Sequence, residues 1–130
     1  MRIDYYDRVE NSLTASLHRL KMDYVDLVLL HRPINERVHE PCLDALMQLQ
    51  ESGKIRHFGV SNFTFAQLEH AWEYTGGKIF TNQVEYHPCL SQEKLKAFAD
   101  EKCMKITAYS PLGHGNLLKN QELQLLATKH

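Results

Sequence analysis

The sequence lacks the features that mark membrane, secreted and nucleic-acid-binding proteins. No apolar run approaches the ~20 residues needed to span a bilayer, and residues 1–4 carry no hydrophobic segment of a signal peptide. The three cysteines, Cys42, Cys89 and Cys103, are odd in number and unpatterned, which argues against a disulfide framework and favours a reducing cytoplasm. The formal net charge is only -1, so neither nucleic acid nor an anionic membrane is favoured as a partner.

Two further absences reduce the number of fold classes that the chain could adopt. No low-complexity segment or linker interrupts the chain, and no G-x-G-x-x-G turn follows a predicted strand. With 130 residues, 43% hydrophobic and 24% charged, residues 1–130 are expected to form a single globular domain or part of one.

The pattern that is present consists of short strands alternating with helices. Residues 24–30 are almost entirely apolar and end at His31, Arg32 and Pro33. A strand that is apolar along its length is expected to be covered on both faces, as in a parallel sheet. Residues 54–60, 79–84 and 104–108 predict three more strands, and a polar loop is expected over 32–40.

Helical stripes precede and separate these strands. The first helix is expected over 4–20, a second begins near Pro41 and ends before Gly53, and Thr64 and Ser91 are expected to cap the next two. A last helix follows residues 111–116. The expected inward-facing residues are Val9, Leu13, Leu17 and Leu20; Cys42, Ala45, Leu46 and Leu49; Leu68, Ala71 and Trp72; Leu95, Phe98 and Ala99; and Leu123, Leu126 and Ala127.

One helix followed by four βα units predicts an α/β fold with a parallel sheet and right-handed crossovers. The spacing of the strand ends suits the units of a TIM barrel, in which ~250 residues make eight units. The chain is therefore expected to form about half of such a barrel, an incomplete one. A doubly wound open sheet is the alternative.

Polar or aromatic side chains stand where each predicted strand stops. They are His31, then Ser61 and Asn62, then Gln83, then Tyr109 and Ser110. If the strands are parallel neighbours, these side chains share one rim, where barrels keep their chemistry. Imidazole can donate to a carbonyl oxygen, the amides and hydroxyl can satisfy a planar amide, and the tyrosine ring can stack on a flat ring. The glycine-containing loop at 111–116 could hold phosphate with backbone N–H groups. This combination predicts a site for a nicotinamide dinucleotide.

Four segments resemble motifs of the aldo-keto reductase family, in the family order and spacing. They are Asp23-Tyr24-Val25-Asp26-Leu27 with His31 and Pro33, Gly53-Lys54-Ile55-Arg56 with Gly59-Val60-Ser61-Asn62-Phe63, Asn82-Gln83-Val84-Glu85-Tyr86-His87-Pro88, and Tyr109-Ser110-Pro111-Leu112-Gly113. The resemblance covers essentially the whole chain. Within the family, the chain resembles the bacterial 2,5-didehydrogluconate reductase-like enzymes.

The resemblance implies a (β/α)8 barrel, of which these strands are the fourth to the seventh, and reduction of aldehydes or ketones with NADP(H) or NAD(H) and no metal. It implies that His31 is the catalytic histidine that orients and polarises the substrate carbonyl. Ser61, Asn62 and Gln83 would bind the nicotinamide carboxamide, and Tyr109 would stack on the nicotinamide ring. The remaining cofactor contacts, at the pyrophosphate, would come from Ser110, Leu112 and Gly113.

The family pattern also contains residues that these 130 do not match. The general-acid tyrosine, its aspartate and its lysine would lie before Met1, and the final strand beyond His130. Tyr5 and Tyr6 stand in the wrong unit to replace the tyrosine. A tuned proton donor is needed as hydride arrives, so the chain alone is expected to be a fragment that reduces carbonyls slowly or not at all.

Other interpretations stay open at this stage. His31, Ser61, Asn62, Gln83 and Tyr109 could be structural, and Arg32 is either a binder of an acidic substrate or a solvated loop residue. The spacing of Cys89, Cys103 and His87 does not suit zinc. Four parallel strands leave two open edges, so a homo-oligomer that supplies eight strands is one expectation. A non-catalytic remnant that binds nucleotide or self-associates is the alternative function.

Overall fold

The computed structural model describes residues 5–33 and 39–130. The predicted loop at 32–40 therefore falls largely outside the described residues. In chain order, the elements are α1 (Tyr5–Leu20), β1 (Val25–Leu30), α2 (His39–Glu51), β2 (Ile55–Ser61), α3 (Phe65–Tyr74), β3 (Ile79–Glu85), α4 (Glu93–Glu101), β4 (Lys105–Tyr109), the 3₁₀ segment η1 (Gly113–Lys119) and α5 (Gln121–Lys129).

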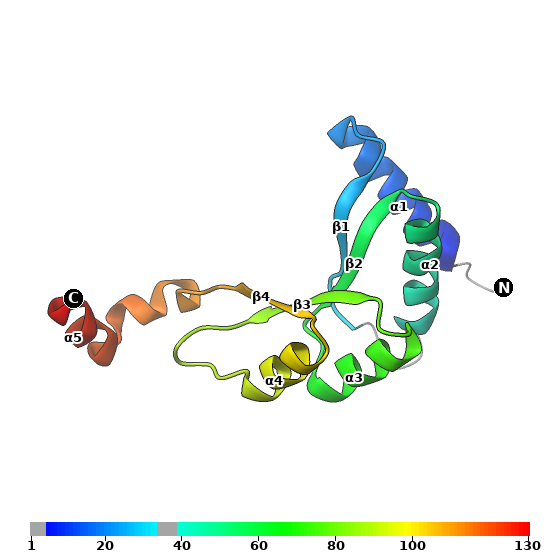
Figure 1. The fold of residues 1–130 in the computed structure, drawn as a ribbon. Coiled ribbons are helices and arrows are strands. Elements are labelled where there is room, and N and C mark those ends of the chain that lie inside the picture. Colours follow the sequence, from blue (N-terminus) through cyan, green and yellow to red (C-terminus); the bar gives the residue numbers. More distant parts are fainter. Residues whose placement is uncertain (1–4, 34–38) are drawn as a thin grey trace.

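The four strands form one parallel sheet in the order β1-β2-β3-β4. Figure 1 shows the sheet turning sharply between β2 and β3, so that β3 and β4 run across the direction of β1 and β2. The sheet does not close. The predicted α/β fold, an incomplete TIM barrel of parallel units, is confirmed.

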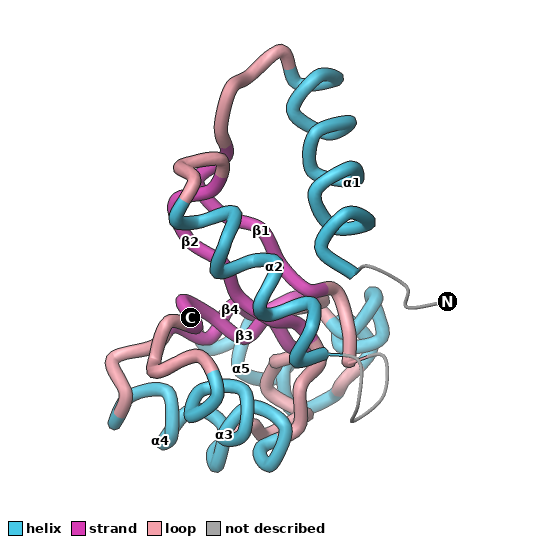
Figure 2. The backbone as a smooth tube through the Cα atoms, turned by 90° about the vertical axis from the view of Figure 1, so that its right-hand side faces the viewer, coloured by secondary structure: helices cyan, strands magenta, loops and turns pink. Residues whose placement is uncertain are grey.

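Helices α2, α3 and α4 pack along the outside of the sheet, and α1 packs beside α2 (Figure 2). One apolar core joins these helices to the strands, because the inward stripe of each helix meets the outward-facing side chains of the sheet. Its most deeply buried members are Leu43, Leu49, Ile55, Phe58, Val60, Phe63 and Leu68.

Two of the predicted helix ends have the expected chemistry. Thr64 caps α3, and its side chain accepts from the Gln67 N–H while the Gln67 side chain accepts from the Thr64 N–H, which is a full capping box. Gly53 follows α2 with φ of 77°. Its N–H donates to Gln50 O and the Lys54 N–H to Leu49 O, which is a Schellman motif.

The prediction that the first strand is covered on both faces is wrong. No residue of β1 is fully buried, and Leu27 keeps 40% of its surface exposed. The reason is that β1 is an edge strand in the part of the chain described, with helices on one face and nothing against the other. Leu20, expected on the inner stripe of α1, is likewise 56% exposed at the end of that helix.

Two predictions for the later helices also fail. Ser91 does not cap α4, because the helix begins at Glu93 and Gln92 takes the cap position without a side-chain bond. Instead, the Gln92 side chain donates to Glu85 O at 2.9 Å. No residue of α5 is buried, because η1 and α5 extend away from the sheet and the other helices (Figure 1).

Gly59 lets the three strands β1, β2 and β3 approach one another below the carboxyl edge. A Cβ at this position would lie 2.5 Å from Thr81 O and 2.9 Å from Leu29 Cδ2. Only glycine fits there without moving backbone. This contact fixes the spacing of the strands whose ends carry the candidate site.

Candidate active site at the carboxyl edge

The structure brings the strand-end residues together on one rim. Val60 is in register with Leu30 and Asn82, and Ser61 is in register with Gln83. The side chains that follow β1, β2, β3 and β4 therefore meet at the carboxyl edge, as parallel strands require. The sequence predicted this juxtaposition correctly.

Asn62 is the centre of the rim. Its φ of 62° is left-handed, a conformation that asparagine adopts more readily than most residues. The side-chain Nδ2 donates to His31 O at 3.0 Å and to Ser61 Oγ at 3.2 Å, while Oδ1 accepts from the Tyr109 hydroxyl at 2.8 Å. One amide thus ties the ends of β1, β2 and β4 together.

Ser61 and Gln83 differ in whether their side-chain polar atoms form hydrogen bonds within the protein. Ser61 is buried, and its hydroxyl donates to Gln83 O at 2.7 Å. The Asn62 N–H donates to the same carbonyl at 2.9 Å. The Gln83 side-chain amide, by contrast, makes no hydrogen bond to the described residues and is half-buried. It is the amide on this rim that remains open to a ligand.

The bond from Tyr109 to Asn62 also reports the curvature of the sheet. These residues belong to β4 and to the end of β2, with β3 between them. The curl of the sheet, like that of a barrel wall, brings the ends of these two strands toward each other. The Tyr109 side chain therefore reaches from β4 past the neighbouring strand to Asn62.

His31 and Arg32 stand together beside the rim. Both are exposed, and with Leu30 and Pro33 they line an open pocket of about 600 Å³. Neither side chain makes a hydrogen bond or an ion pair with the described residues. The imidazole and the guanidinium are thus both accessible to a solute.

The loop after β4 holds the residues predicted to contact phosphate. Ser110 and Gly113 have positive φ values of 48° and 54°, and Ser110 Oγ lies 3.1 Å from His114 Nε2. The Gly113 N–H donates to Ser110 O, so that donor is used within the turn. Leu112 is exposed. Several N–H donors of this loop are thus used internally, and the remaining ones are the candidates for binding an anion.

Two polar residues near the site, Asn82 and His87, were assigned no role in it from the sequence. Asn82 is fully buried and its Nδ2 donates to Phe63 O at 3.0 Å, but its Oδ1 has no partner among the described residues. His87 Nδ1 is likewise buried without a partner among the described residues, while its Nε2 lies 3.4 Å from Glu85 Oε1. Successive side chains of a strand point to opposite faces, so Gln83 and Asn82 lie on opposite faces of β3. This alternation is the sequence signal that could have distinguished the open amide of Gln83 from the buried amide of Asn82.

The clear pKa shifts lie away from the rim. Burial raises the pKa of the Cys42 thiol. Burial, followed by a hydrogen bond to Asp44, raises the pKa of Tyr74 to about 12. Among residues 5–33 and 39–130, no group of three His, Cys, Asp or Glu side chains could hold a metal ion. No helix in the same described part is long and apolar enough to cross a membrane.

The fold and the rim together define a class, the parallel (β/α) barrels, of which this chain forms about half. Residues 4–128 match the aldo/keto reductase family. The chain belongs to that family.

Known relatives agree with this assignment. The chain is 38% identical to glyoxal reductase of Bacillus subtilis over 96% of its own length and 45% of that protein. It is 39% identical to methylglyoxal reductase DkgB of Escherichia coli O157:H7, over 95% of this chain and 48% of the relative. The chain therefore spans about half the length of the curated relatives it matches.

Solved structures show the same relationship. An aldo/keto reductase from Brucella melitensis superimposes with a TM-score of 0.87 at 35% identity, over 96% of this chain and 48% of that one. A single-residue mutant of Gox0644, crystallised in complex with NADPH, gives a TM-score of 0.88 at 30% identity, over 100% of this chain and 49% of that one.

Proposed function

We propose that this chain supplies the cofactor-facing half of an NADP(H)-dependent reductase that converts aldehydes or ketones to alcohols. The observation that carries the proposal is the rim itself, where four strand ends bring His31, Asn62, Gln83 and Tyr109 to one edge. The NADPH complex of a 30%-identical relative supports the choice of cofactor. The finer resemblance to 2,5-didehydrogluconate reductases and a cytoplasmic location remain predictions.

The residues present fit a nicotinamide group. Gln83 offers an amide that makes no bond to the described residues, so it can pair with a carboxamide without losing a contact. Asn62 Oδ1 and Ser61 Oγ add acceptor capacity beside it, and Tyr109 offers a ring for stacking. We assign the contacts to the pyrophosphate to Ser110, Leu112 and Gly113 of the loop after β4. The nicotinamide, when bound, supplies the hydride.

His31 has a role that depends on its accessibility. Its exposed imidazole can donate a hydrogen bond to a carbonyl oxygen, which orients the carbonyl and stabilises the charge that develops on that oxygen. Arg32, in the same pocket, can pair with an acidic group of the substrate. The Asn62 bond to His31 O holds the backbone that presents both side chains.

The proposal includes a limit on what residues 1–130 do alone. Protonation of the alkoxide needs a donor with a tuned pKa, and no residue here matches the family's tyrosine, lysine or aspartate. The whole barrel's activity therefore requires groups that this half does not supply. We expect the 130-residue chain to bind the cofactor and to reduce carbonyls slowly or not at all.

The test is a titration of NADPH fluorescence with the 130-residue chain, followed by a chase with methylglyoxal. Saturable binding that Gln83→Ala weakens supports the assignment of the rim. Gln121→Ala, on the exposed first turn of α5, is the matched control and should bind as the unmodified chain does. Absence of binding contradicts the cofactor proposal, and turnover at an ordinary enzymatic rate contradicts the argument about the missing acid.

A second candidate is a non-catalytic remnant that self-associates or binds nucleotide. The open sheet edges favour it, since an unpaired strand invites another chain. Binding of NADPH without any turnover, even when the first half of a relative's barrel is supplied, would favour this candidate over the reductase.

A further inference from the structure

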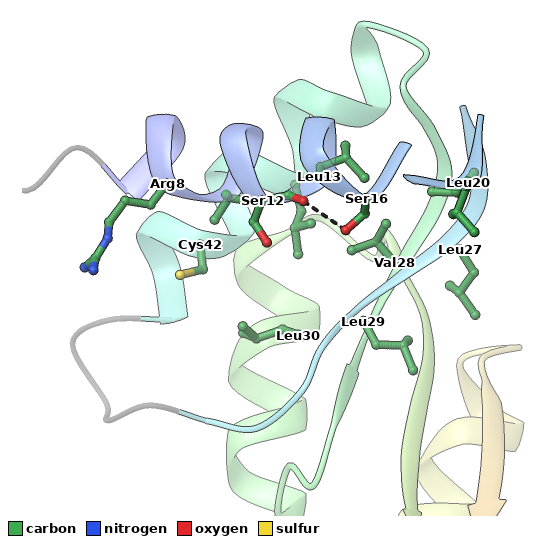
Figure 3. A pocket seen from close by; sticks show the side chains of 13 residues that line it. Arg8, Ser12, Leu13, Ser16, Leu20, Leu27, Val28, Leu29, Leu30 and Cys42 are labelled. Atoms are coloured by element: carbon green, nitrogen blue, oxygen red, sulfur yellow. Dashed lines mark hydrogen bonds between the residues drawn. The ribbon is translucent and has the colours of Figure 1, made fainter. Parts of the chain in front are cut away.

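Two grooves lie beside the helices that cover the sheet. The larger, about 590 Å³, lies between α1, β1 and α2, and Figure 3 shows Leu13 and Ser16 of α1 above Val28 of β1. The smaller, about 390 Å³, lies between α3 and α4, which stand side by side in both views of the fold (Figures 1 and 2). Its lining combines aromatic and charged side chains, whereas the lining of the larger groove is mainly apolar. The smaller groove therefore offers more specific chemistry.

Two aromatic rings line the smaller groove. Trp72 of α3 and Phe98 of α4 meet edge to face, with ring centroids 6.5 Å apart and an interplanar angle of 84°. The chain turns after α3 at Gly76 and Gly77, both of which have positive φ. A Cβ at Gly77 would lie 3.1 Å from Trp72 Cζ2, so the backbone passes close against the indole. Contacts with Phe98 and with this turn thus hold the Trp72 ring in place.

Trp72 also offers a hydrogen-bond donor. Its side chain is half-buried, and its Nε1–H makes no hydrogen bond with the described residues. This nitrogen is not among the buried polar atoms that lack a partner, so it reaches solvent. An indole N–H can only donate, and a carbonyl oxygen of a polypeptide backbone is a suitable acceptor for it.

Two carboxylates of α3 stand beside the indole. Glu69 and Glu73 both line the groove and are exposed. They lie one helical turn apart, where like charges repel each other. Neither carboxylate makes a hydrogen bond or an ion pair with the described residues. A cation bound between them would relieve the repulsion and gain two acceptors that are not used within the protein.

The groove already contains one cation over an aromatic ring. Lys102 Nζ lies 5.7 Å from the centroid of Phe98 and donates to Glu101 Oε1 at 2.8 Å. The hydrogen bond to Glu101, followed by the charges of Glu73 and Glu69, raises the pKa of Lys102. One ammonium thus stands among three carboxylates, and negative charge remains in excess beside Trp72. The contact between Lys102 and Phe98 is the kind that a second cation could make with the indole.

We propose that the groove between α3 and α4 binds an arginine side chain of a partner polypeptide. A guanidinium is planar, stacks on aromatic rings and presents forked donors to carboxylates. Trp72 supplies the ring, Glu69 and Glu73 supply the acceptors, and the indole N–H donates to a backbone carbonyl beside the arginine. Free arginine fits less well, because its own carboxylate would be repelled by the two glutamates. The volume lies within the range of about 300–1,000 Å³ that is usual for ligand sites.

This groove is separate from the candidate nicotinamide site. After Gly76 and Gly77 the chain enters β3, and after Lys102 it enters β4. The groove therefore lies toward the amino edge of the sheet, whereas the rim lies at the carboxyl edge. A partner bound between α3 and α4 leaves the rim open, so this inference does not rest on the proposed function. Affinity for NADPH should be the same with and without the partner.

Trp72 is the single tryptophan of the chain, so its fluorescence and its indole N–H signal in an ¹⁵N–¹H spectrum report on this groove alone. The probe is a tripeptide with arginine between two glycines, blocked at both ends and titrated to millimolar concentration. We expect both signals to change and to saturate. The same peptide with citrulline, which has the shape of arginine without the charge, is the matched control ligand and should give no saturable change. The peptide with lysine should bind more weakly than the arginine peptide, because an ammonium is not planar.

Three results would overturn the proposal. The first is the absence of a saturable change with the arginine peptide. The second is equal binding of the citrulline or the lysine peptide, which would mean that the groove does not recognise a guanidinium. The third is equal or tighter binding of free arginine, which would replace the polypeptide by a small molecule.

Variants of the two glutamates locate the contact. Glu69→Gln and Glu73→Gln remove one charge each from exposed positions and keep the size of the side chain. Each should weaken binding of the arginine peptide about two- to fivefold, the range of an exposed ion pair. Glu122→Gln, which removes an exposed carboxylate from α5, is the matched control and should bind the peptide as the unmodified chain does. Equal affinity of all three variants would contradict the assignment of this groove.

Discussion

Tyr109 allows the proposed nicotinamide site to be tested by removing one hydroxyl and keeping the aromatic ring. Its hydroxyl donates to Asn62 Oδ1 at 2.8 Å, and the same oxygen is the acceptor that we assign to a bound carboxamide. The Tyr109→Phe substitution removes the competing donor and keeps the ring for stacking. A hydrogen bond between neutral groups contributes about 0.5–1.5 kcal/mol net. Since 1.4 kcal/mol is a factor of ten, we expect Tyr109→Phe to bind NADPH about two- to tenfold more tightly.

The assay is the fluorescence titration of NADPH, with Tyr109→Ala as the second variant. Loss of the ring removes stacking that contributes about 1–3 kcal/mol for a base on an aromatic side chain, so Tyr109→Ala should bind at least several-fold more weakly. Opposite effects of the two variants identify the ring as the contact and the hydroxyl as a competitor. Weaker binding by Tyr109→Phe would refute this reasoning, because the hydroxyl would then contribute to the ligand rather than compete with it.

Three further outcomes follow from other parts of the structure. Gly59→Ala places a Cβ 2.5 Å from Thr81 O and should destabilise the fold by about 1–3 kcal/mol. The urea concentration at the midpoint of unfolding should be lower. An unchanged midpoint would show that β2 and β3 are farther apart than described. The pKa of Tyr74 rises from 10 to about 12 in the folded chain, so the stability that this shift contributes is present below pH 10 and is lost between pH 10 and 12. Tyr74→Phe should therefore lose less unfolding free energy over that interval than the unmodified chain. Equal losses would contradict the shift. Burial raises the pKa of Cys42 while Cys89 is exposed, so a thiol reagent should label Cys89 much faster in the native chain, and equal rates would contradict the burial of Cys42.

The sequence predicts the elements of this fold well because each has a local cause. Thr64 with Gln67 starts a helix, Gly53 ends one, and apolar runs of five to seven residues alternate with amphipathic stripes. What the sequence could not predict is which of these surfaces find a partner. Leu27 in an apolar strand and Leu126 on an apolar stripe look buried by pattern, yet both are exposed, since burial depends on neighbours that the pattern does not specify.

For the candidate site, too, one part could be predicted from the sequence and another could not. Parallel strands bring His31, Asn62, Gln83 and Tyr109 to one edge, and this much follows from the order of the elements. The hydrogen bonds that Asn62 makes to His31 O and Tyr109 join residues from three different strand ends, and no single strand encodes such contacts. The sequence therefore predicted the members of the rim but not that one of them already holds the others together.

The most direct test of the rim is an ¹⁵N–¹H correlation spectrum of the 130-residue chain titrated with reduced nicotinamide mononucleotide, a probe that carries the nicotinamide without the adenosine half. We predict that the side-chain amide signals of Gln83 and Asn62 and the backbone signal of Tyr109 shift together and saturate. The exposed amide of Gln121 should not move. Shifts confined to other parts of the chain, or none at concentrations where NADPH binds, would contradict the claim that this strand edge is the nicotinamide site.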